Sequence, residues 1–458
     1  MKKLLALFAA IMMLLSAMVG AAPAGADGPD DDVDDEAESP AYFVNEAKLA
    51  FGAVPGVVTT RQWGVLEGSG YRIEVPSNWN GSLVMWAHGF RGEGLELTVD
   101  NHPLRAFLVA NGYAWAASSY SRNGYNPGQG AEDTHELTKF FRKEIGKPKR
   151  TYITGASMGG HVTAALAEQH PRTYAGAMPI CGVLGDFELF DYFLDFNVAA
   201  QTLSGVGKTF PYGPDYLTTT VPATKAALGP VFPFVLNPNG EQLKSLTELR
   251  SGGDRPLFDQ GFLFWNGVAG DFLFGLGVGD GNIEPGQGSV VDNTDAVYQF
   301  DTNPALNDAE TAFNASVQRL RAEREARERN DEGWVPITEG ELRIPTLTLH
   351  TLGDLFVPFH MEQEYARRVA AKGNAQFLVQ RATRDVGHCS FTGPELVRTF
   401  SDLVAWVEAG IKPAGDNVLD PAIVADPQYG CTFTDKTSPR LWNSDRRLAF
   451  LTPPPCQT

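Results

Sequence analysis

The pentapeptide Gly155-Ala156-Ser157-Met158-Gly159 places a serine where its hydroxyl can become reactive. Glycines two residues before and after a serine suit a sharp turn from a strand into a helix, because neighbouring backbone can approach without a Cβ clash. Such a turn holds the serine in a strained backbone with its hydroxyl exposed. Serine alone is a weak nucleophile, so it needs a base, and the base needs an acid to orient it. Ser157 is therefore the predicted nucleophile.

The acid and the base are predicted further along the chain, as Asp354 and His388. Asp354 follows a glycine just after a predicted strand at 344–350, and His388 follows Gly387 in the loop after the next predicted strand. Both positions lie at the carboxyl edge of the predicted sheet, where catalytic groups collect in α/β proteins. The order serine, acid, histidine along the chain agrees with this assignment.

Other acids and histidines in this region have alternative explanations. Glu362 lies within a predicted helix, and Asp385 lies in the same loop as the predicted base, where it can fix a turn. His350 lies in a predicted strand and suits a hydrogen-bonded core position, whereas His360 begins a predicted helix and can cap it. The remaining histidines in question are expected to pack behind the serine (His161) or to lie at the surface (His102, His135 and His170).

Two backbone N–H groups are predicted to stabilise the negative charge that develops on the substrate oxygen. One belongs to Met158, the residue after the nucleophile. The other belongs to Phe90, in the tripeptide His88-Gly89-Phe90 that follows a predicted strand at 83–87. The glycines after Phe90 lack a P-loop pattern, and the chain has neither H-E-x-x-H nor a dinucleotide fingerprint. No metal and no cofactor are predicted.

Strands and helices alternate on both sides of a long interruption, which predicts a mainly parallel sheet flanked by helices. The other predicted elements are strands at 61–66, 71–75, 113–118, 150–154, 174–181 and 375–380, and helices at 103–110, 133–145, 160–169, 361–371 and 394–409.

The interruption covers 186–341, is rich in aromatic residues and is broken by proline and glycine. We interpret it as a cap inserted over one end of the sheet, with one highly charged helix at Asp308–Arg329. Its aromatic residues suit an apolar or aromatic substrate, and they equally suit a small core within the cap itself.

The beginning of the chain predicts export. Residues 1–26 have a short positive start, an apolar stretch and a small-residue end at Ala24-Gly25-Ala26, which is typical of a signal peptide cleaved near Ala26. An uncleaved anchor is the alternative. Residues 27–40 are acidic and are expected to be disordered. The formal net charge of −18 disfavours nucleic acid as a partner.

These residues together resemble the α/β-hydrolase superfamily over residues 60–185 and 342–410. The resemblance implies an eight-stranded sheet with a cap inserted after the sixth strand. The chain segments 41–185 and 342–412 then form the core on either side of the cap, and 413–458 forms a tail. It leaves the reaction open, because esterases, lipases and peptidases share the fold. A serine at the elbow disfavours dehalogenases, which use aspartate there.

Four cysteines in an exported chain suggest two disulfides, and four cysteines allow three pairings. His388-Cys389 is similar to tannases and feruloyl esterases, in which a cysteine after the catalytic histidine bridges to one just before the catalytic serine. Here Ala156 precedes Ser157, which departs from that pattern, and Cys181 ends the next strand. The resemblance then implies Cys181–Cys389, which leaves Cys431 and Cys456 to close a loop in the tail.

The leading hypothesis is an exported serine hydrolase of carboxylic esters, small or polymeric. Met158 and Phe90 also resemble their counterparts in cutinases and polyester hydrolases. A serine exopeptidase of the proline-iminopeptidase kind is the second hypothesis, and it needs an anionic cluster such as Glu188, Asp191 and Asp195 in the cap. A non-catalytic binding protein is the third. The sequence does not indicate an oligomeric state.

Overall fold

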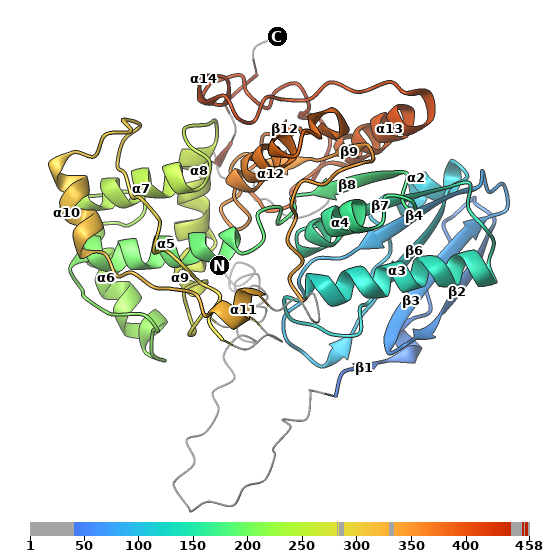
Figure 1. The fold of residues 1–458 in the computed structure, drawn as a ribbon, viewed down its shortest axis with the longest axis horizontal. Helices are drawn as coiled ribbons and strands as arrows, with labels where there is room; N and C mark the ends of the chain where they lie inside the picture. The colour runs from blue at the N-terminus through green and yellow to red at the C-terminus, as the bar shows by residue number, and fades with distance from the viewer. Residues whose placement is uncertain are drawn as a thin grey trace, which may run out of the picture.

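The computed structural model describes residues 41–281, 283, 288–328, 334–440, 451–452 and 454–456 (Figure 1). Its centre is an eight-stranded sheet in the order β11-β9-β8-β7-β4-β6-β3-β2. Strand β3 runs antiparallel to both of its neighbours, β2 and β6, and the other pairs are parallel. The predicted eight-stranded, mainly parallel sheet is confirmed. The strands are β2 (Thr59–Leu66), β3 (Ser69–Pro76), β4 (Ser82–Ala87), β6 (Ala114–Ser118), β7 (Arg150–Ala156), β8 (Gly176–Ile180), β9 (Thr346–Leu347) and β11 (Leu378–Val379).

Helices cover both faces of this sheet because the central strands are apolar on both sides. In β4, Leu83 and Met85 join a buried cluster with α3 (Pro127–Glu144) and α4 (Met158–Gln169). The alternate residues of the same strand, Val84 and Trp86, join a second cluster that includes α2 (Arg105–Ala110) and α13 (Gly393–Ala409). Side chains of a strand point alternately to the two faces, so the sheet is the middle layer of three.

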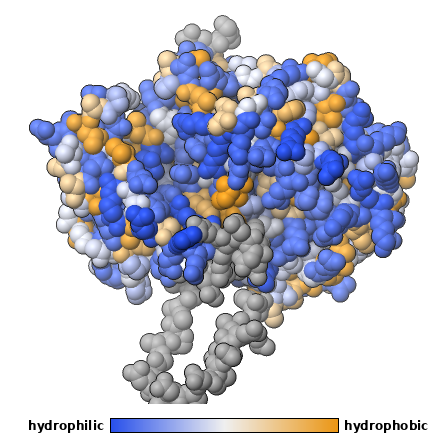
Figure 2. Space-filling model, in the orientation of Figure 1, coloured by the Kyte–Doolittle hydropathy of each residue, from blue (hydrophilic) through white to orange (hydrophobic). Residues whose placement is uncertain are grey.

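The chain between the sixth strand, β8, and the seventh, β9, forms a group of helices at the left of Figure 1, with the last of them, α11, near the centre. These are α5 (Glu188–Ser204), α6 (Val221–Leu228), α7 (Pro238–Arg250), α8 (Phe258–Leu263), α9 (Phe272–Gly275), α10 (Asp308–Ser316) and α11 (Arg324–Glu328), with π-helical turns η3 (Tyr216–Thr220) and η4 (Phe264–Val268). We call this group the cap. On the face shown in Figure 2 hydrophilic residues predominate, and apolar residues gather on the cap and at its junction with the sheet.

The single charged helix predicted at Asp308–Arg329 is wrong: the structure has two helices, α10 and α11. Val317 is extended, with φ −64° and ψ 138°, and ends α10. The segment that follows pairs with the chain around Asn293 instead of continuing the helix. The N–H of Asn293 donates to the Leu320 carbonyl oxygen at 3.0 Å, and the Leu320 N–H donates to Asn293 Oδ1 at 2.7 Å. Arg329 lies outside the described residues.

Several element boundaries also differ from those predicted. Helix α3 begins six residues early, because the Asn126 side chain accepts from the Gln129 N–H and Pro127 suits the first turn. The strand predicted at 344–350 is split into β9 and β10 (His350–Thr351), which pairs with β12 (Ala382–Thr383). A short pair, β1 (Phe43–Val44) and β5 (Glu96–Leu97), lies outside the main sheet. The remaining helices are α12 (His360–Ala371) and α14 (Pro421–Val424).

The segment after α13 packs against the core. Val418, Val424 and Tyr429 form a buried cluster with Leu352 and Phe359, and a disulfide joins Cys431 to Cys456. The predicted signal peptide and acidic segment, at 1–26 and 27–40, lie outside the described residues. Within the described ranges, none of the helices has the length and apolar character needed to cross a membrane.

Candidate active site

Ser157 lies at a sharp turn between β7 and α4, with φ 60° and ψ −123°. This conformation is strained for a residue with a side chain. The glycines on either side are sterically required. A Cβ at Gly155 would overlap the carbonyl oxygen of Gly159, and a Cβ at Gly159 would overlap that of Ala87 at the end of β4. The close approach of three backbone segments therefore holds the serine at the edge of the sheet.

The segment His88–Phe90 runs directly over this serine. A Cβ placed on Gly89 would lie 3.1 Å from Ser157 Cβ and 3.6 Å from its Oγ. Met158 is the first residue of α4, and the first N–H groups of a helix have no partner within the helix. The two predicted N–H donors, Phe90 and Met158, each directly follow one of these two contacting residues, Gly89 and Ser157.

His88 shapes this segment from behind. Its Nδ1 lies 2.7 Å from the Gly89 carbonyl oxygen, its Nε2 lies 2.8 Å from that of Ser119, and its ring stacks on Tyr120 at 3.8 Å. Burial, with a further effect from Arg91, lowers the pKa of His88 to about 3. The burial of this ring and its contacts with two backbone carbonyls suit a structural role for His88.

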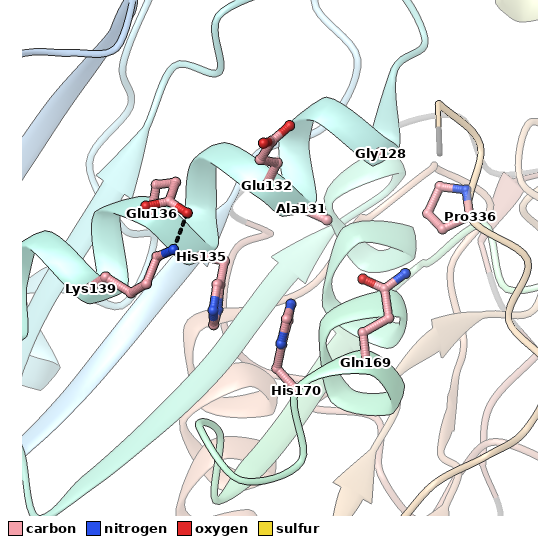
Figure 3. Close-up of a pocket in the computed structure, with 9 residues that line it drawn as sticks. All are labelled: Gly128, Ala131, Glu132, His135, Glu136, Lys139, Gln169, His170 and Pro336. Carbon is pink, nitrogen blue, oxygen red and sulfur yellow. Dashed lines mark ion pairs between the residues drawn. The ribbon is translucent and has the colours of Figure 1, made fainter. Parts of the chain in front are cut away.

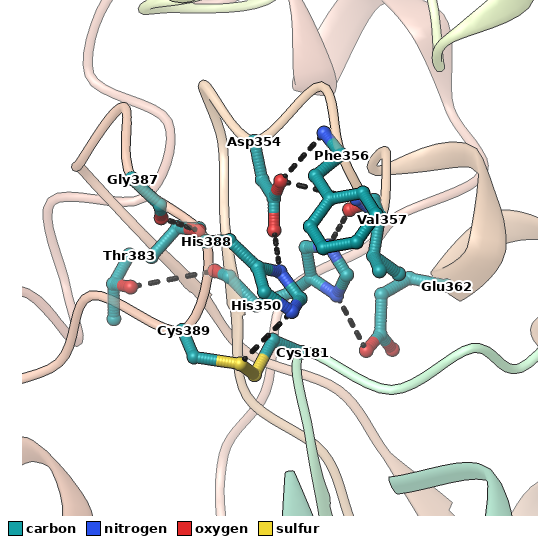
Figure 4. Close-up of a disulfide and its surroundings, with 11 residues drawn as sticks. Cys181, His350, Asp354, Phe356, Val357, Glu362, Thr383, Gly387, His388 and Cys389 are labelled. Atoms are coloured by element: carbon teal, nitrogen blue, oxygen red, sulfur yellow. Dashed lines mark hydrogen bonds and ion pairs between the residues drawn. A yellow bond between two sulfur atoms is a disulfide. The ribbon is translucent and has the colours of Figure 1, made fainter. Parts of the chain in front are cut away.

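His388 and Asp354 form a close pair (Figure 4). Nδ1 of His388 lies 2.6 Å from Oδ2 of Asp354. The other carboxylate oxygen, Oδ1, accepts the N–H groups of Phe356 at 2.9 Å and Val357 at 3.1 Å. Asp354 is fully buried, whereas the His388 side chain is 16% exposed. The carboxylate is fixed on one side by the backbone and offers its other oxygen to the imidazole, which is the arrangement that orients a histidine base.

The disulfide Cys181–Cys389 connects this pair to the serine (Figure 4). The Ser157 N–H donates to the carbonyl oxygen of Ile180, the residue before Cys181, at 3.0 Å. Cys389 follows His388, and its Sγ lies 3.4 Å from His388 Nε2. Both disulfides thus have the expected partners. The disulfide therefore links the strand end that contacts Ser157 to the loop that carries His388.

The competing acids and histidines have other partners. Asp385 Oδ1 accepts the Gly387 N–H at 3.0 Å and so fixes the turn, as expected. Glu362 faces the buried His350, with Oε1 3.4 Å from Nδ1. His360 is half-buried and lies in the first turn of α12, whose N-cap is Phe359, so the cap predicted at His360 is wrong.

Two other histidines are buried, one as expected and one not. His161 packs behind the serine as predicted: its Nε2 lies 2.6 Å from the Pro336 carbonyl oxygen, and its Nδ1 accepts from Tyr125. His102 was expected at the surface and is instead only 2% exposed. Its Nδ1 accepts the Leu104 N–H at 2.9 Å, and its Nε2 lies 2.9 Å from Thr154 Oγ1. The loop that carries it folds back onto β7, which no local pattern indicates.

An aromatic wall borders the histidine and was not anticipated residue by residue. The Phe356 ring meets the His388 ring edge-on at 5.0 Å. Phe272, Trp265 and Phe193, all from the cap, lie 5.0, 6.2 and 6.2 Å from Phe356 between ring centres. The aromatic runs were visible in the sequence, but their convergence on His388 depends on how the cap folds.

Arginines pair with two of the three acids proposed for an amine-binding cluster. Arg327 pairs with Asp191, and Arg250 Nε donates to Asp195 at 2.6 Å. Burial raises the pKa of Asp191 to about 7 and raises that of Asp195 as well, against the effect of these arginines. Neither carboxylate is available as a free anionic site.

A hollow of about 420 Å³ lies away from this site, between α3 and the end of α4 (Figure 3). His135 and His170 line it with their rings stacked at 3.8 Å and 8°. Imidazole lone pairs lie in the ring plane, so two parallel rings do not converge on one ion. Among the described residues, the group with metal-ligand spacing is His388 with Cys181 and Cys389. Both of those sulfurs are in the disulfide, so they offer no thiolate.

Comparisons with known proteins find partial similarities. The model of the prolyl oligopeptidase family matches residues 110–208, from the end of α2 to just beyond α5. The o-phthalyl amidase of Xanthobacter agilis is 23% identical over 411 residues, covering 76% of this chain and 87% of that protein. An esterase from Aspergillus oryzae aligns with 15% identity and a TM-score of 0.42, covering 78% of this chain and 81% of its own. Feruloyl esterase B from Aspergillus oryzae aligns with 15% identity and a TM-score of 0.38, covering 79% and 82%.

The strand order, the single antiparallel second strand and the serine elbow define an α/β-hydrolase fold. The chain therefore has the α/β-hydrolase fold, which esterases and peptidases share.

Proposed function

We propose that this protein is an exported serine hydrolase that cleaves carboxylic esters with an apolar or aromatic acyl group. The observation that carries the proposal is the 2.6 Å contact between His388 and Asp354, linked through the Cys181–Cys389 disulfide to the backbone that holds Ser157. An oriented imidazole and a partly exposed serine at an elbow are the base and the nucleophile that acyl transfer needs.

The reaction follows from these positions. Ser157 Oγ attacks the ester carbonyl carbon, and its proton passes to His388 Nε2. The carbonyl oxygen becomes negative and is held by the N–H groups of Phe90 and Met158. The C–O bond to the alcohol then breaks as Nε2 returns the proton to the leaving oxygen. A water molecule repeats the sequence on the acyl-enzyme, which releases the acid and restores the serine. Asp354 stabilises the charged imidazole in both halves.

The aromatic wall supports an aromatic or apolar acyl group. Phe356 is partly exposed beside His388, and Phe272 behind it is also partly exposed. Rings in edge and offset contacts favour flat apolar groups through area and quadrupole effects. The substrate class therefore includes aromatic acid esters, feruloyl-type esters among them, and polyesters built on aromatic acids.

Amide hydrolysis is a second candidate. The relative from Xanthobacter agilis is named an o-phthalyl amidase, and an o-phthalyl group contains an aromatic ring. The same serine, histidine and oxyanion donors can expel an amine, provided that His388 protonates the leaving nitrogen. Esters remain the first choice because they are the more reactive acyl donors.

The other two hypotheses have weaker support. An exopeptidase needs an anionic site for a free α-amine, and Asp191 and Asp195 are engaged with arginines. A binding protein has no need for the close Asp354–His388 pair. Export is supported by the two disulfides, and the acidic surface favours small or polymeric uncharged substrates over nucleic acid.

A panel of matched esters and amides tests the proposal. The substrates are p-nitrophenyl acetate, butyrate and benzoate, methyl ferulate, and the anilides of the same acids. Each is tested on the wild type and on Ser157→Ala. Ester turnover and fluorophosphonate labelling in the wild type, both abolished by Ser157→Ala, are the expected results. Turnover of the anilides alone would establish the amidase instead, and labelling that survives in Ser157→Ala would refute the assignment of the nucleophile.

A further inference from the structure

We infer that Trp265 of the cap is a positioning residue for the Asp354–His388 pair, and this inference rests on the proposed function. Its indole N–H donates to the carbonyl oxygens of Gly353 at 3.1 Å and of Val386 at 3.0 Å. Gly353 precedes Asp354, and Val386 lies two residues before His388. One N–H group from the cap thus holds the loop of the acid and the loop of the base at the same time.

The two loops are also bonded to each other. The Gly353 N–H donates to the Asp385 carbonyl oxygen at 2.9 Å, and Thr351 Oγ1 donates to that of Gly387 at 2.9 Å. The indole N–H completes this set from the side of the cap. The carbonyl of Gly353 and the N–H of Asp354 belong to one planar peptide group. A hydrogen bond that holds this oxygen therefore also fixes the orientation of the Asp354 N–H.

The cap segment around Trp265 is anchored at the same place by two further contacts. Arg255 Nε donates to the Leu352 carbonyl oxygen at 2.8 Å. In α8, a Cβ at Gly261 would overlap the Gly353 carbonyl oxygen, so this helix touches the acid loop through bare backbone. Trp265 itself lies in the π-helical turn η4, a geometry that is frequent at functional sites. This part of the cap is therefore a fixed support for the acid and base loops.

The indole ring also supports the aromatic wall. Its centre lies 4.8 Å from that of Phe272 and 6.2 Å from that of Phe356, and the side chain is 6% exposed. The N–H and the ring therefore act on different parts of the site. Loss of the N–H should lower the rate of the chemical step, whereas loss of ring area should change binding of the substrate.

Trp265→Phe tests this separation, with Trp79→Phe as the matched control. Trp79 donates one indole hydrogen bond, to the Ser82 carbonyl oxygen at 2.8 Å, near the opposite end of β4. We expect kcat to fall between about 10- and 100-fold in Trp265→Phe, and KM to rise as well because phenyl is smaller than indole. The control should keep both constants. Replacement of Trp265 by 3-benzothienylalanine, in which sulfur replaces the N–H, removes the donor while keeping the ring area. It should reproduce the loss of kcat with KM within about threefold of the wild type.

A second readout does not depend on turnover. The proton between His388 Nδ1 and Asp354 is expected as a downfield proton resonance, which should weaken or move in Trp265→Phe and persist in Trp79→Phe. If kcat and this resonance are unchanged in both Trp265 variants, the inference is wrong. A wild type that turns over neither esters nor amides would contradict the proposed function instead, and the resonance would still test the positioning.

Discussion

Sγ of Cys389 lies 3.4 Å from Nε2 of His388, the ring nitrogen that faces away from Asp354. The disulfide therefore borders the nitrogen that is proposed to accept the serine proton. Its other half, Cys181, directly follows the residue that accepts the Ser157 N–H. The disulfide and the Ser157–Ile180 hydrogen bond thus connect the two segments between which proton transfer is proposed.

The two disulfides should differ in their effect on activity. Removal of Cys181–Cys389 in the double variant Cys181→Ala/Cys389→Ala opens a link between residues 208 apart, worth about 5 kcal/mol in a chain-entropy estimate. It should also release the loop of His388, so kcat should fall at least about tenfold in protein that remains folded. Urea unfolding and ester kinetics measure the two effects.

The control is Cys431→Ala/Cys456→Ala, which opens a link of 25 residues outside the site. We expect a loss of about 3.5 kcal/mol in stability with kcat retained. Equal losses of kcat in the two double variants would show that the disulfide beside His388 has no special effect on the site.

Asp354→Asn should lower kcat by about 10⁴-fold with a smaller change in KM, because an amide cannot stabilise the charged imidazole or fix its tautomer. The comparison is Glu362→Gln, which alters the other buried acid of this region, the one that faces His350. That variant should lose stability and retain kcat within about fivefold. A larger loss of kcat in Glu362→Gln than in Asp354→Asn would reassign the acid.

Phe356→Leu should change the choice of acyl group. The leucine keeps an apolar contact and removes the ring that meets His388, Phe272 and Phe193. An aromatic pair contributes about 1 kcal/mol beyond its area, so kcat/KM for a benzoate ester should fall about fivefold relative to an acetate ester of the same alcohol. An unchanged benzoate-to-acetate ratio would place the acyl group elsewhere.

The buried His102 should make the protein less stable in acid. Burial lowers the pKa of His102 to about 3, and protonation of Nδ1 would break its bond from the Leu104 N–H. Between pH 6.5 and about 3 the folded state binds fewer protons at this histidine than the unfolded state does. Its contribution to the free energy of unfolding is therefore present above pH 6.5 and falls by up to about 1.4 kcal/mol per pH unit below it.

Urea unfolding at pH 7.5, 6.0 and 5.0 checks this slope by comparing the wild type with His102→Gln. The variant should be less stable at pH 7.5, and its free energy of unfolding should fall less steeply toward pH 5.0. Other titrating groups are common to both proteins, so the difference between the two curves isolates His102. Parallel curves would contradict the prediction.

Much of the fold follows from local patterns. The alternation of strands and helices predicted the mainly parallel sheet and the interruption at 186–341, because apolar periodicity lies in consecutive residues. The position of the cap after the sixth strand followed from the resemblance to α/β-hydrolases. The same patterns failed where backbone groups find distant partners. Residues 317–320 leave the predicted charged helix to bond with Asn293, and His102 is buried against Thr154.

The sequence by itself determined the strained serine turn at Ser157 and the order in which Asp354 and His388 follow it. Both depend on spacing along the chain and on glycines that only a tight turn requires. The tertiary structure alone decided what surrounds them: the wall at Phe356, the arginine partners of Asp191 and Asp195, and the bridge from Trp265. Trp265 is 88 residues from Gly353 and 121 from Val386. Contacts of that range are set by how the cap packs on the sheet, and no local periodicity encodes them.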